Sequence, residues 1–448
     1  MRSTAAVAAL SSVVLCGVPY QAQASTSAQE QPSTLAHAQV AGPAQAQVVG
    51  PAQAQVVGPA QAQPARLAHT QAAGPAQAQV VGPAQAQPAR LAHTQAAGPA
   101  QVQAVGLGRA GAAGTESAGL ALPEPTGSKP VGMTTLHLTD KSRPDPWNPE
   151  ALHRELLVSL WYPAKKGEKA TARRVPYMTA QESAAVLKGF PVAPDTLTKV
   201  TTHARLKAPA AAGRRPLVVM SPGFSFPRAT LTSLAEDFAS RGYLVAAVEH
   251  TYESVATTFP DGRTTTCLAC VKGQDHAKVA ASRARDVRFV LDELIGGGWG
   301  RRIDRSRIAM VGHSVGGYAA AQAMLADGRI KAGVNLDGTF RVDEPLKRPF
   351  MLIGAPKSHT PGGTDESWKK AWRNLAGWKR WITVEGTDHS AFVDYAVLRP
   401  QAGLPAQELD GGRALEITRA HLAGFLDRHL LGRNTPVKDY PEVTVHSP

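Results

Sequence analysis

Cysteine is scarce in this sequence, with three in 448 residues. Cys267 and Cys270 stand close together, but only His276 is near enough to add a metal ligand, which is too few for a zinc site. Aromatic residues make up 6% of the chain, and no helix-turn-helix, zinc-module or aromatic-basic sheet motif accompanies them. The sequence therefore predicts no bound metal and no nucleic-acid partner.

The amino-terminal apolar run, residues 5–18, is shorter than the roughly 20 residues that a membrane-spanning helix needs. It follows Met1-Arg2 and precedes Ala22-Gln23-Ala24. This order of basic, apolar and small residues is typical of a secretory signal peptide. We expect residues 1–24 to be removed from a secreted protein that is extracellular or associated with the cell envelope.

Large side chains are nearly absent from residues 25–125, which consist mainly of Ala, Gln, Pro, Gly and Val. A 24-residue unit that begins at Val56 returns at Val80. A repeat of this length can form a solenoid, but these units have almost nothing to bury and are interrupted by Gly-Pro. We predict a disordered spacer over 25–125, followed by one catalytic domain over 126–448.

Acidic residues are outnumbered in the predicted domain, where 32 of them stand against 44 basic residues. A positive balance of this kind suits anionic surfaces. We expect most of these charges to be solvated, with at most a weak association with an anionic membrane or cell-wall surface.

The most informative motif is Gly-His-Ser-Val-Gly-Gly at 312–317. It follows the apolar run 307–311 and precedes the alanine-rich run 318–325, so that a strand, a tight turn and a helix are expected in this order. Glycine at two positions of the motif would let the turn hold Ser314 in a strained conformation. The alternative is a glycine-rich helix start that Ser314 caps. The flanking strand and helix favour a nucleophilic serine.

A nucleophilic serine needs a base, and the base needs an acid that orients it. In an α/β-hydrolase the acid and then the base follow the serine, each after a strand. Asp337 follows the apolar run 330–336, and His389 comes shortly after the apolar run 380–384. The sequence therefore predicts Asp337 as the acid and His389 as the base.

Three other carboxylates and one histidine are weaker candidates for these roles. Asp365 follows a strand at a place where many hydrolases keep their acid, but its Pro and Gly neighbours indicate a mobile surface loop. Asp388 and Asp394 are too close to His389 in the sequence and are expected to be solvated. His250 precedes the serine, so we expect a hydrogen-bonded histidine at the rim of the site.

Acyl transfer also needs hydrogen-bond donors for the developing oxyanion. The backbone N–H of Val315, directly after the serine, is one expected donor. An earlier apolar run leads into Ser-Pro-Gly-Phe and then into a helix expected over 228–240, which predicts the N–H of Phe224 as the second donor. Phe226 and Phe392 are candidates to line an apolar acyl pocket, with core packing as the alternative for each.

Cys267 and Cys270 are the cysteines that remain after removal of the signal peptide. In an exported chain we expect a disulfide between them. The alternatives are a redox motif, which would open a helix in a thioredoxin pattern, and a metal site, which would need further ligands. We expect the small ring to pin a loop near the rim of the site.

The segments 221–224 (SPGF), 244–250 (LVAAVEH), 285–292 (RDVRFVLD), 312–317 (GHSVGG) and 335–338 (NLDG) occur in this order. Together they resemble the platelet-activating-factor acetylhydrolase family, in its plasma and intracellular type II form, and particularly its bacterial members. The resemblance covers about residues 128–431. It implies Ser314, Asp337 and His389 as nucleophile, acid and base, and Phe224 and Val315 as oxyanion donors.

The expected architecture is an α/β-hydrolase fold, an α/β class protein with a mostly parallel central sheet and helices on both faces. We expect a serine esterase that hydrolyses short-acyl phospholipid-like or small esters through an acyl-enzyme and needs no cofactor. A cutinase-like or lipase-like hydrolase of polyesters or neutral lipids is the alternative. A catalytically idle surface-binding protein is a second alternative.

Overall fold

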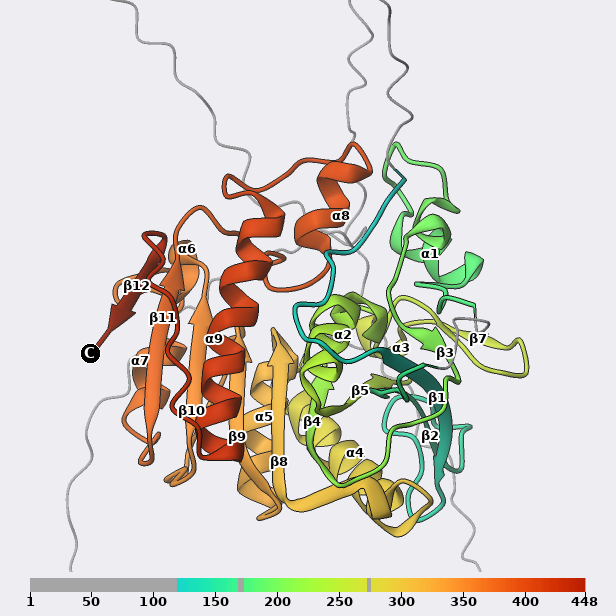
Figure 1. Ribbon diagram of the computed structural model, residues 1–448, viewed down its shortest axis with the longest axis horizontal. Helices are drawn as coiled ribbons and strands as arrows, with labels where there is room; N and C mark the ends of the chain where they lie inside the picture. Colours follow the sequence, from blue (N-terminus) through green and yellow to red (C-terminus); the bar gives the residue numbers. More distant parts are fainter. Residues whose placement is uncertain (1–118, 168–172, 272–274, 448) are drawn as a thin grey trace, which may run out of the picture. The chain divides into compact units, whose positions relative to one another are not determined.

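A ten-stranded sheet forms the centre of the protein (Figure 1). The computed structural model describes residues 119–167, 173–271 and 275–447. The predicted signal peptide and the predicted spacer up to residue 118 lie outside the described residues. Within the described ranges, no helix is long and apolar enough to cross a membrane.

The strands lie side by side in the order β12-β11-β10-β9-β8-β4-β5-β2-β1-β3. Neighbours from β11 across to β5 are parallel, whereas β12 and β2 pair antiparallel with their neighbours. Their bounds are β1 Val131–Asp140, β2 Arg154–Pro163, β3 Arg205–Leu206, β4 Arg215–Ser221, β5 Leu244–His250, β8 Ile303–His313, β9 Ile330–Leu336, β10 Phe350–Gly354, β11 Lys379–Val384 and β12 Val443–His446. A separate pair consists of β6 Thr257–Thr258 and β7 Thr264–Thr265.

Helices cover both faces of the sheet (Figure 1). Apolar residues of α2 and α9 belong to one core cluster, and those of α4 and α5 belong to the other. The α-helices are α1 Ala180–Val186, α2 Thr232–Arg241, α3 Leu268–Val271, α4 His276–Gly296, α5 Val315–Ala326, α6 Pro356–His359, α7 Ser367–Trp372, α8 Tyr395–Gln401 and α9 Gly411–Leu431. Short 3₁₀ turns are Thr196–Lys199, Arg228–Leu231 and Gly300–Arg302.

The central strands are buried on both faces, which explains their sequences. Parallel strands between two helical layers are near-continuous apolar runs rather than alternating ones. In β4 the successive residues Leu217, Val218, Val219 and Met220 are all 0% exposed. The predicted α/β-hydrolase architecture is confirmed, and the apolar runs before Ser314, Asp337 and His389 are β8, β9 and β11.

The chain changes direction across the sheet between β4 and β8. From β4 it passes through α2 to β5 on one side, and then returns through α4 to β8 on the other side of β4. Such a switch point opens a crevice at the carboxyl ends of the strands, where α/β proteins bind their ligands. The segments after β4 and β8 therefore lie at the same carboxyl edge of the sheet.

The folded domain begins before residue 126, the start that the sequence predicts. Leu122 is only 3% exposed, and its N–H donates to the carbonyl oxygen of Thr201 at 3.0 Å. The guanidinium of Arg419 donates to the carbonyl oxygens of Pro123 and Glu124 at 3.2 and 3.0 Å. The predicted boundary at 126 is too late, because Leu122 fills part of the core. The sequence gives little sign of this, since Leu122 directly follows a low-complexity segment.

We predict that Leu122→Ala lowers the free energy of unfolding by about 2–4 kcal/mol, because it removes a buried leucine side chain from the core. Leu152→Ala is the matched control, since Leu152 is 77% exposed, and it should change stability by less than about 0.5 kcal/mol. Urea unfolding of the full chain measures both values. Equal effects of the two substitutions would contradict the packing of Leu122.

Candidate active site

Ser314 lies in a tight turn between β8 and α5. Its φ of 54° and ψ of −127° are strained for a residue with a side chain. The N–H of Ser314 donates to the carbonyl oxygen of Leu336 at 2.8 Å, which fixes the turn to the end of β9. The N–H of Gly317 donates to the carbonyl oxygen of Ser314 at 2.8 Å. This strand, turn and helix have the geometry of a nucleophile elbow.

Three glycines allow the backbone to approach this turn closely. A Cβ on Gly312 would overlap the carbonyl oxygen of Gly316, and a Cβ on Gly316 would overlap the carbonyl oxygen of Ser221. A Cβ on Gly338 would overlap the carbonyl oxygen of Ser314 itself. The first two glycines are those of the sequence motif. The third, directly after Asp337, brings the end of β9 against the turn.

Asp337 follows β9 and presents a buried carboxylate to two neighbouring segments. Its Oδ2 accepts a hydrogen bond from Nδ1 of His389 at 2.7 Å, and its Oδ1 accepts the N–H of Ala355 at 2.7 Å. Burial opposes the ionisation of Asp337, but hydrogen bonds from His359 and His389 outweigh burial and hold its pKa well below the usual value. The ionised carboxylate orients His389, whose side chain is 41% exposed.

His313 connects the segment of His389 to the turn of Ser314. Its Nε2 donates to the carbonyl oxygen of His389 at 2.7 Å, and the two ring centroids are 4.7 Å apart. Burial and the neighbouring His389 lower the pKa of His313 to about 3, so this imidazole is neutral. Asp337 and His389 are thus in direct contact. Ser314 is linked to both, because it bonds to Leu336, which precedes Asp337, and follows His313, which bonds to His389.

The loop after β4 also reaches the site. The guanidinium of Arg283, in α4, donates to the carbonyl oxygen of Pro222 at 2.5 Å and to the hydroxyl of Ser221 at 3.1 Å. The partly buried Phe224 follows in this loop and packs in one apolar cluster with Val315. The side chains of Phe224 and Val315, the residues of the two predicted oxyanion donors, thus share one apolar cluster, and α4 holds the loop that carries Phe224.

A second serine, histidine and aspartate anchor this loop. The hydroxyl of Ser221 donates to Nε2 of His250 at 3.0 Å, and Nδ1 of His250 donates to Asp286 at 2.7 Å. Each of the three residues is at most 1% exposed, so substrate has no access to this serine. His250 is hydrogen-bonded as expected, but its predicted place at the rim is wrong, because the surrounding charged side chains and α4 enclose it.

Two buried arginines balance the acids around His250. Arg154 donates to Asp145 at 2.7 Å and to Asp286 at 2.8 Å, and Arg283 donates to Glu253 at 2.7 Å. Burial opposes the charge of Asp286, but Arg154 outweighs burial and holds the pKa of Asp286 well below its usual value. Loss of one member would leave another charge buried and unpaired. The loop after β4 therefore keeps its shape only while all of these arginines and acids are present.

Phe226 and Phe392 do not line a pocket. They are 3% and 0% exposed and belong to the core cluster that contains the apolar residues of α8 and α9. The expectation that they contact an acyl group is therefore wrong, and the alternative of core packing holds. Phe224 and Tyr252 are instead the partly buried aromatic side chains that pack beside Val315.

Asp394 is buried, with 0% of its surface exposed, so the expectation that it is solvated is wrong. Its carboxylate oxygens accept the N–H groups of Thr232 and Ser233 at 3.1 Å each, at the start of α2. Burial raises the pKa of Asp394 to about 7. Asp394 thus caps the start of α2, and this contact buries its carboxylate.

A histidine outside every sequence motif contacts Asp337. His359, the last residue of α6, bonds through Nδ1 to Oδ1 of Asp337 at 2.6 Å and through Nε2 to Oδ2 of Asp365 at 3.0 Å. Asp365, the weaker candidate for the acid, is therefore linked to Asp337 through His359. The one sequence signal for His359 is its position shortly after β10, whose carboxyl end lies at the same edge as those of β9 and β11.

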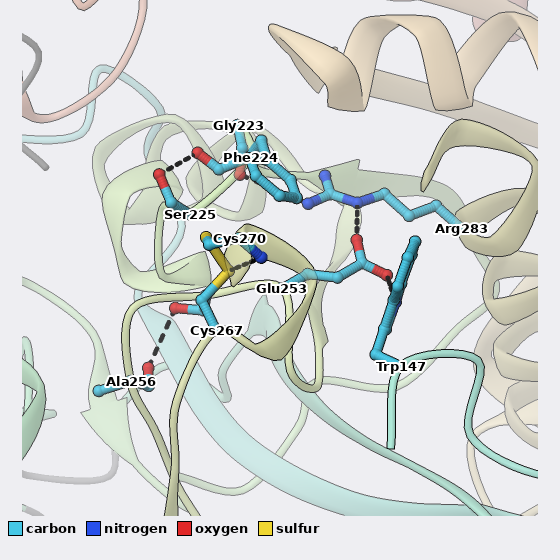
Figure 2. The surroundings of a disulfide bond; sticks show 10 residues. Trp147, Gly223, Phe224, Ser225, Glu253, Ala256, Cys267, Cys270 and Arg283 are labelled. Carbon is cyan, nitrogen blue, oxygen red and sulfur yellow. Dashed lines mark hydrogen bonds and ion pairs between the residues drawn. A yellow bond between two sulfur atoms is a disulfide. The ribbon is translucent and has the colours of Figure 1, made fainter. Parts of the chain in front are cut away.

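The structure joins Cys267 and Cys270 by a disulfide beside the loop after β4 (Figure 2). Cys267 packs in the same apolar cluster as Phe224, and the N–H of Ala269 donates to the carbonyl oxygen of Tyr252 at 3.0 Å. Across the described residues, no group of three or more His, Cys, Asp or Glu side chains could hold a metal ion.

The switch point of the sheet, the turn at Ser314 and the Asp337–His389 pair belong together in an α/β-hydrolase fold. The sequence profile of the family described as platelet-activating factor acetylhydrolase, isoform II, matches residues 115–266 and 298–436. The chain belongs to this family.

Similar proteins agree with this assignment. A probable 1-alkyl-2-acetylglycerophosphocholine esterase of Arthroderma benhamiae is 26% identical over 370 residues, which cover 72% of this chain and 92% of that protein. A platelet-activating factor acetylhydrolase of Canis lupus familiaris is 23% identical over 69% of this chain and 77% of that protein. A solved structure of a ferulic acid esterase from Streptomyces cinnamoneus is 42% identical, has a TM-score of 0.66, and covers 74% of this chain and all of that chain. The chain is therefore a carboxylic ester hydrolase.

We predict that Gly338→Ala lowers kcat/KM at least about 10-fold and destabilises the protein by about 1–3 kcal/mol, because the new Cβ would meet the carbonyl oxygen of Ser314. Gly328→Ala is the control, since nothing lies within 4 Å of a Cβ at that position. Steady-state kinetics and thermal unfolding of both variants test this. Wild-type activity in the Gly338 variant would show that the end of β9 does not constrain the turn.

Proposed function

We propose that the protein is a secreted serine esterase that hydrolyses small carboxylic esters through Ser314, His389 and Asp337. The observation that carries the proposal is the 2.7 Å hydrogen bond between a buried, ionised Asp337 and the partly exposed His389, next to the strained turn of Ser314. An oriented base beside a nucleophile that substrate can reach is the requirement for acyl transfer, and Ser314 is partly exposed.

In the proposed reaction, His389 takes the proton of the Ser314 hydroxyl while the oxygen attacks the ester carbonyl. Asp337 holds the imidazole in the tautomer that accepts this proton and stabilises the imidazolium that forms. The backbone N–H groups of Phe224 and Val315 stabilise the oxyanion. His389 then protonates the leaving alcohol, and a water molecule releases the acid from the acyl-enzyme by the reverse sequence.

The proposed substrate class is esters of small acids, with aromatic acids of the ferulic type as the first candidate. Two observations support this choice. The similar Streptomyces cinnamoneus structure, at 42% identity, is that of a ferulic acid esterase. Phe224 and Tyr252, both partly buried aromatic residues, pack beside Val315 at the proposed oxyanion site, where a planar acyl group would find aromatic contact.

Short-acyl phospholipid-like esters are the second candidate. The family match and the Arthroderma benhamiae relative, a probable 1-alkyl-2-acetylglycerophosphocholine esterase, support it. Polyesters and neutral lipids, the substrates of a cutinase-like or lipase-like enzyme, are a third class. The three classes differ in acyl group and in physical state, so one panel of substrates separates them.

We predict that Ser314→Ala lowers kcat for p-nitrophenyl acetate by about 1,000-fold or more, because the nucleophile is lost. The melting temperature should stay within about 2 °C of wild type, since the side chain contributes little packing. A variant with more than a tenth of wild-type activity would exclude Ser314 as nucleophile. Absence of labelling of the wild type by a fluorophosphonate would favour an idle binding protein.

The same assays identify the substrate class. Wild-type kcat/KM is measured on methyl ferulate, on a short-acyl phosphatidylcholine, on a triglyceride and on a polyester film. We expect methyl ferulate to be hydrolysed fastest. A higher kcat/KM on the phospholipid would select the second candidate, and activity confined to the triglyceride or the film would select the third.

We also propose that Cys267 and Cys270 are bridged in the exported protein. Peptides from the unreduced protein should weigh two hydrogens less than the dithiol form. The double substitution Cys267→Ser/Cys270→Ser should raise KM about 3–10-fold, because the bridge lies beside Phe224. It should lower the melting temperature by no more than about 5 °C, since a short ring removes little chain entropy. Two thiols that alkylate readily in the native protein would contradict the bridge.

A further inference from the structure

The hydrogen bonds of Asp337 extend the site beyond His389. Oδ2 of Asp337 lies 2.7 Å from Nδ1 of His389, and Oδ1 lies 2.6 Å from Nδ1 of His359. The other nitrogen of His359, Nε2, lies 3.0 Å from Oδ2 of Asp365. The four side chains thus form one chain of hydrogen bonds, from the partly exposed His389 to the loop before α7.

The far end of this chain of hydrogen bonds is held in place. The N–H of Ser367 donates to Oδ1 of Asp365 at 2.7 Å, and the hydroxyl of Thr339 donates to its Oδ2. The ring of His359 stacks on Trp368, with centroids 4.3 Å apart and planes 21° apart. These contacts leave His359 one orientation, in which both of its nitrogens face carboxylate oxygens.

His359 is positively charged in this arrangement. An ionised carboxylate only accepts hydrogen bonds, so both nitrogens of His359 must carry protons to bond to Asp337 and Asp365. Burial opposes this charge, but the hydrogen bonds to the two carboxylates outweigh burial and raise the pKa of His359 to about 9. One carboxylate, that of Asp337, therefore separates a buried cation from His389.

We propose that His359 is a positioning residue that holds the carboxylate of Asp337 toward His389 and offsets part of its negative charge. Asp365 supports this role as the second partner that keeps His359 protonated. The inference rests on the proposed catalytic roles of Asp337 and His389.

The expected consequence concerns the pH range of the base. A carboxylate beside an imidazole favours the protonated form, which cannot act as a base. A cation on the far side of that carboxylate weakens this effect. Loss of this cation should therefore move the acid limb of the pH–rate profile upward. The other ring that faces His389 is His313, which is neutral because burial lowers its pKa to about 3.

Two substitutions at position 359 separate orientation from charge. In His359→Asn the amide nitrogen falls near the position of Nδ1, so the donor to Asp337 stays and the charge is lost. In His359→Gln the amide nitrogen falls near Nε2, so the donor to Asp337 is lost as well. His153→Asn, at an exposed histidine, is the control. The measurement is kcat and KM for p-nitrophenyl acetate from pH 5 to 9 on the full chain.

We expect the acid limb of kcat/KM to move about one pH unit upward in both variants at position 359. The plateau kcat of His359→Asn should stay within about 3-fold of wild type, whereas that of His359→Gln should fall about 10-fold with KM unchanged. The profile of His153→Asn should superimpose on wild type. An unshifted acid limb in His359→Asn would overturn the role of the charge, and equal plateaus in the two variants would overturn the role in orientation.

Further measurements distinguish failure of this proposal from failure of the proposed function. Asp337→Asn should lower the plateau kcat about 10⁴-fold, and Asp365→Asn should lower it less than about 10-fold. Retained activity in Asp337→Asn would mean that the proposed function itself fails. If the variants at position 359 do not fold, NMR of ¹⁵N-histidine-labelled wild type decides instead. One imidazolium that persists at pH 8 supports the proposal, and its absence overturns it.

Discussion

One buried carboxylate, that of Asp337, constrains the segments that follow three neighbouring strands of the sheet. Asp337 loses its water on folding, so its charge must be met by hydrogen-bond donors from the protein. The donors come from three places: the backbone of Ala355 after β10, His359 in α6, and His389 after β11. Three neighbouring parallel strands thus converge on one side chain. The same contacts that satisfy a buried charge therefore also fix the orientation of the partly exposed imidazole of His389.

On the other side of the site, buried charged side chains likewise fix the segment around Ser221. There a buried cluster of arginines, acids and His250 holds the loop after β4, while Ser221 donates to His250 as a catalytic serine would to its base. Its burial and the hydrogen bond from Arg283 make this arrangement structural. Chemistry therefore depends on exposure and backbone geometry as much as on residue type. Of the two serines, Ser314 stands in the strained turn, with φ of 54°.

The sequence contains enough to locate the strands and the residues that follow them. Buried parallel strands are continuous apolar runs, so the positions of Ser314, Asp337 and His389 at strand ends are readable from the chain. His359 is not, because α6 is only four residues long and resembles a polar loop. Its burial depends on Trp368, in the next helix. Phe226 and Phe392 show the converse, since hydrophobicity alone does not separate a pocket wall from the core.

The carboxyl-terminal strand protects the sheet at the edge nearest His389. β12 pairs antiparallel with β11 and is tied to α9 by hydrogen bonds from Arg413 to Glu442 at 2.8 and 3.1 Å. Without it, the backbone of β11 would offer unpaired donors and acceptors to the strands of other molecules. β12 itself has four residues, a length that gives little template for intermolecular pairing. β12 thus guards against aggregation at an edge where the sheet could otherwise grow.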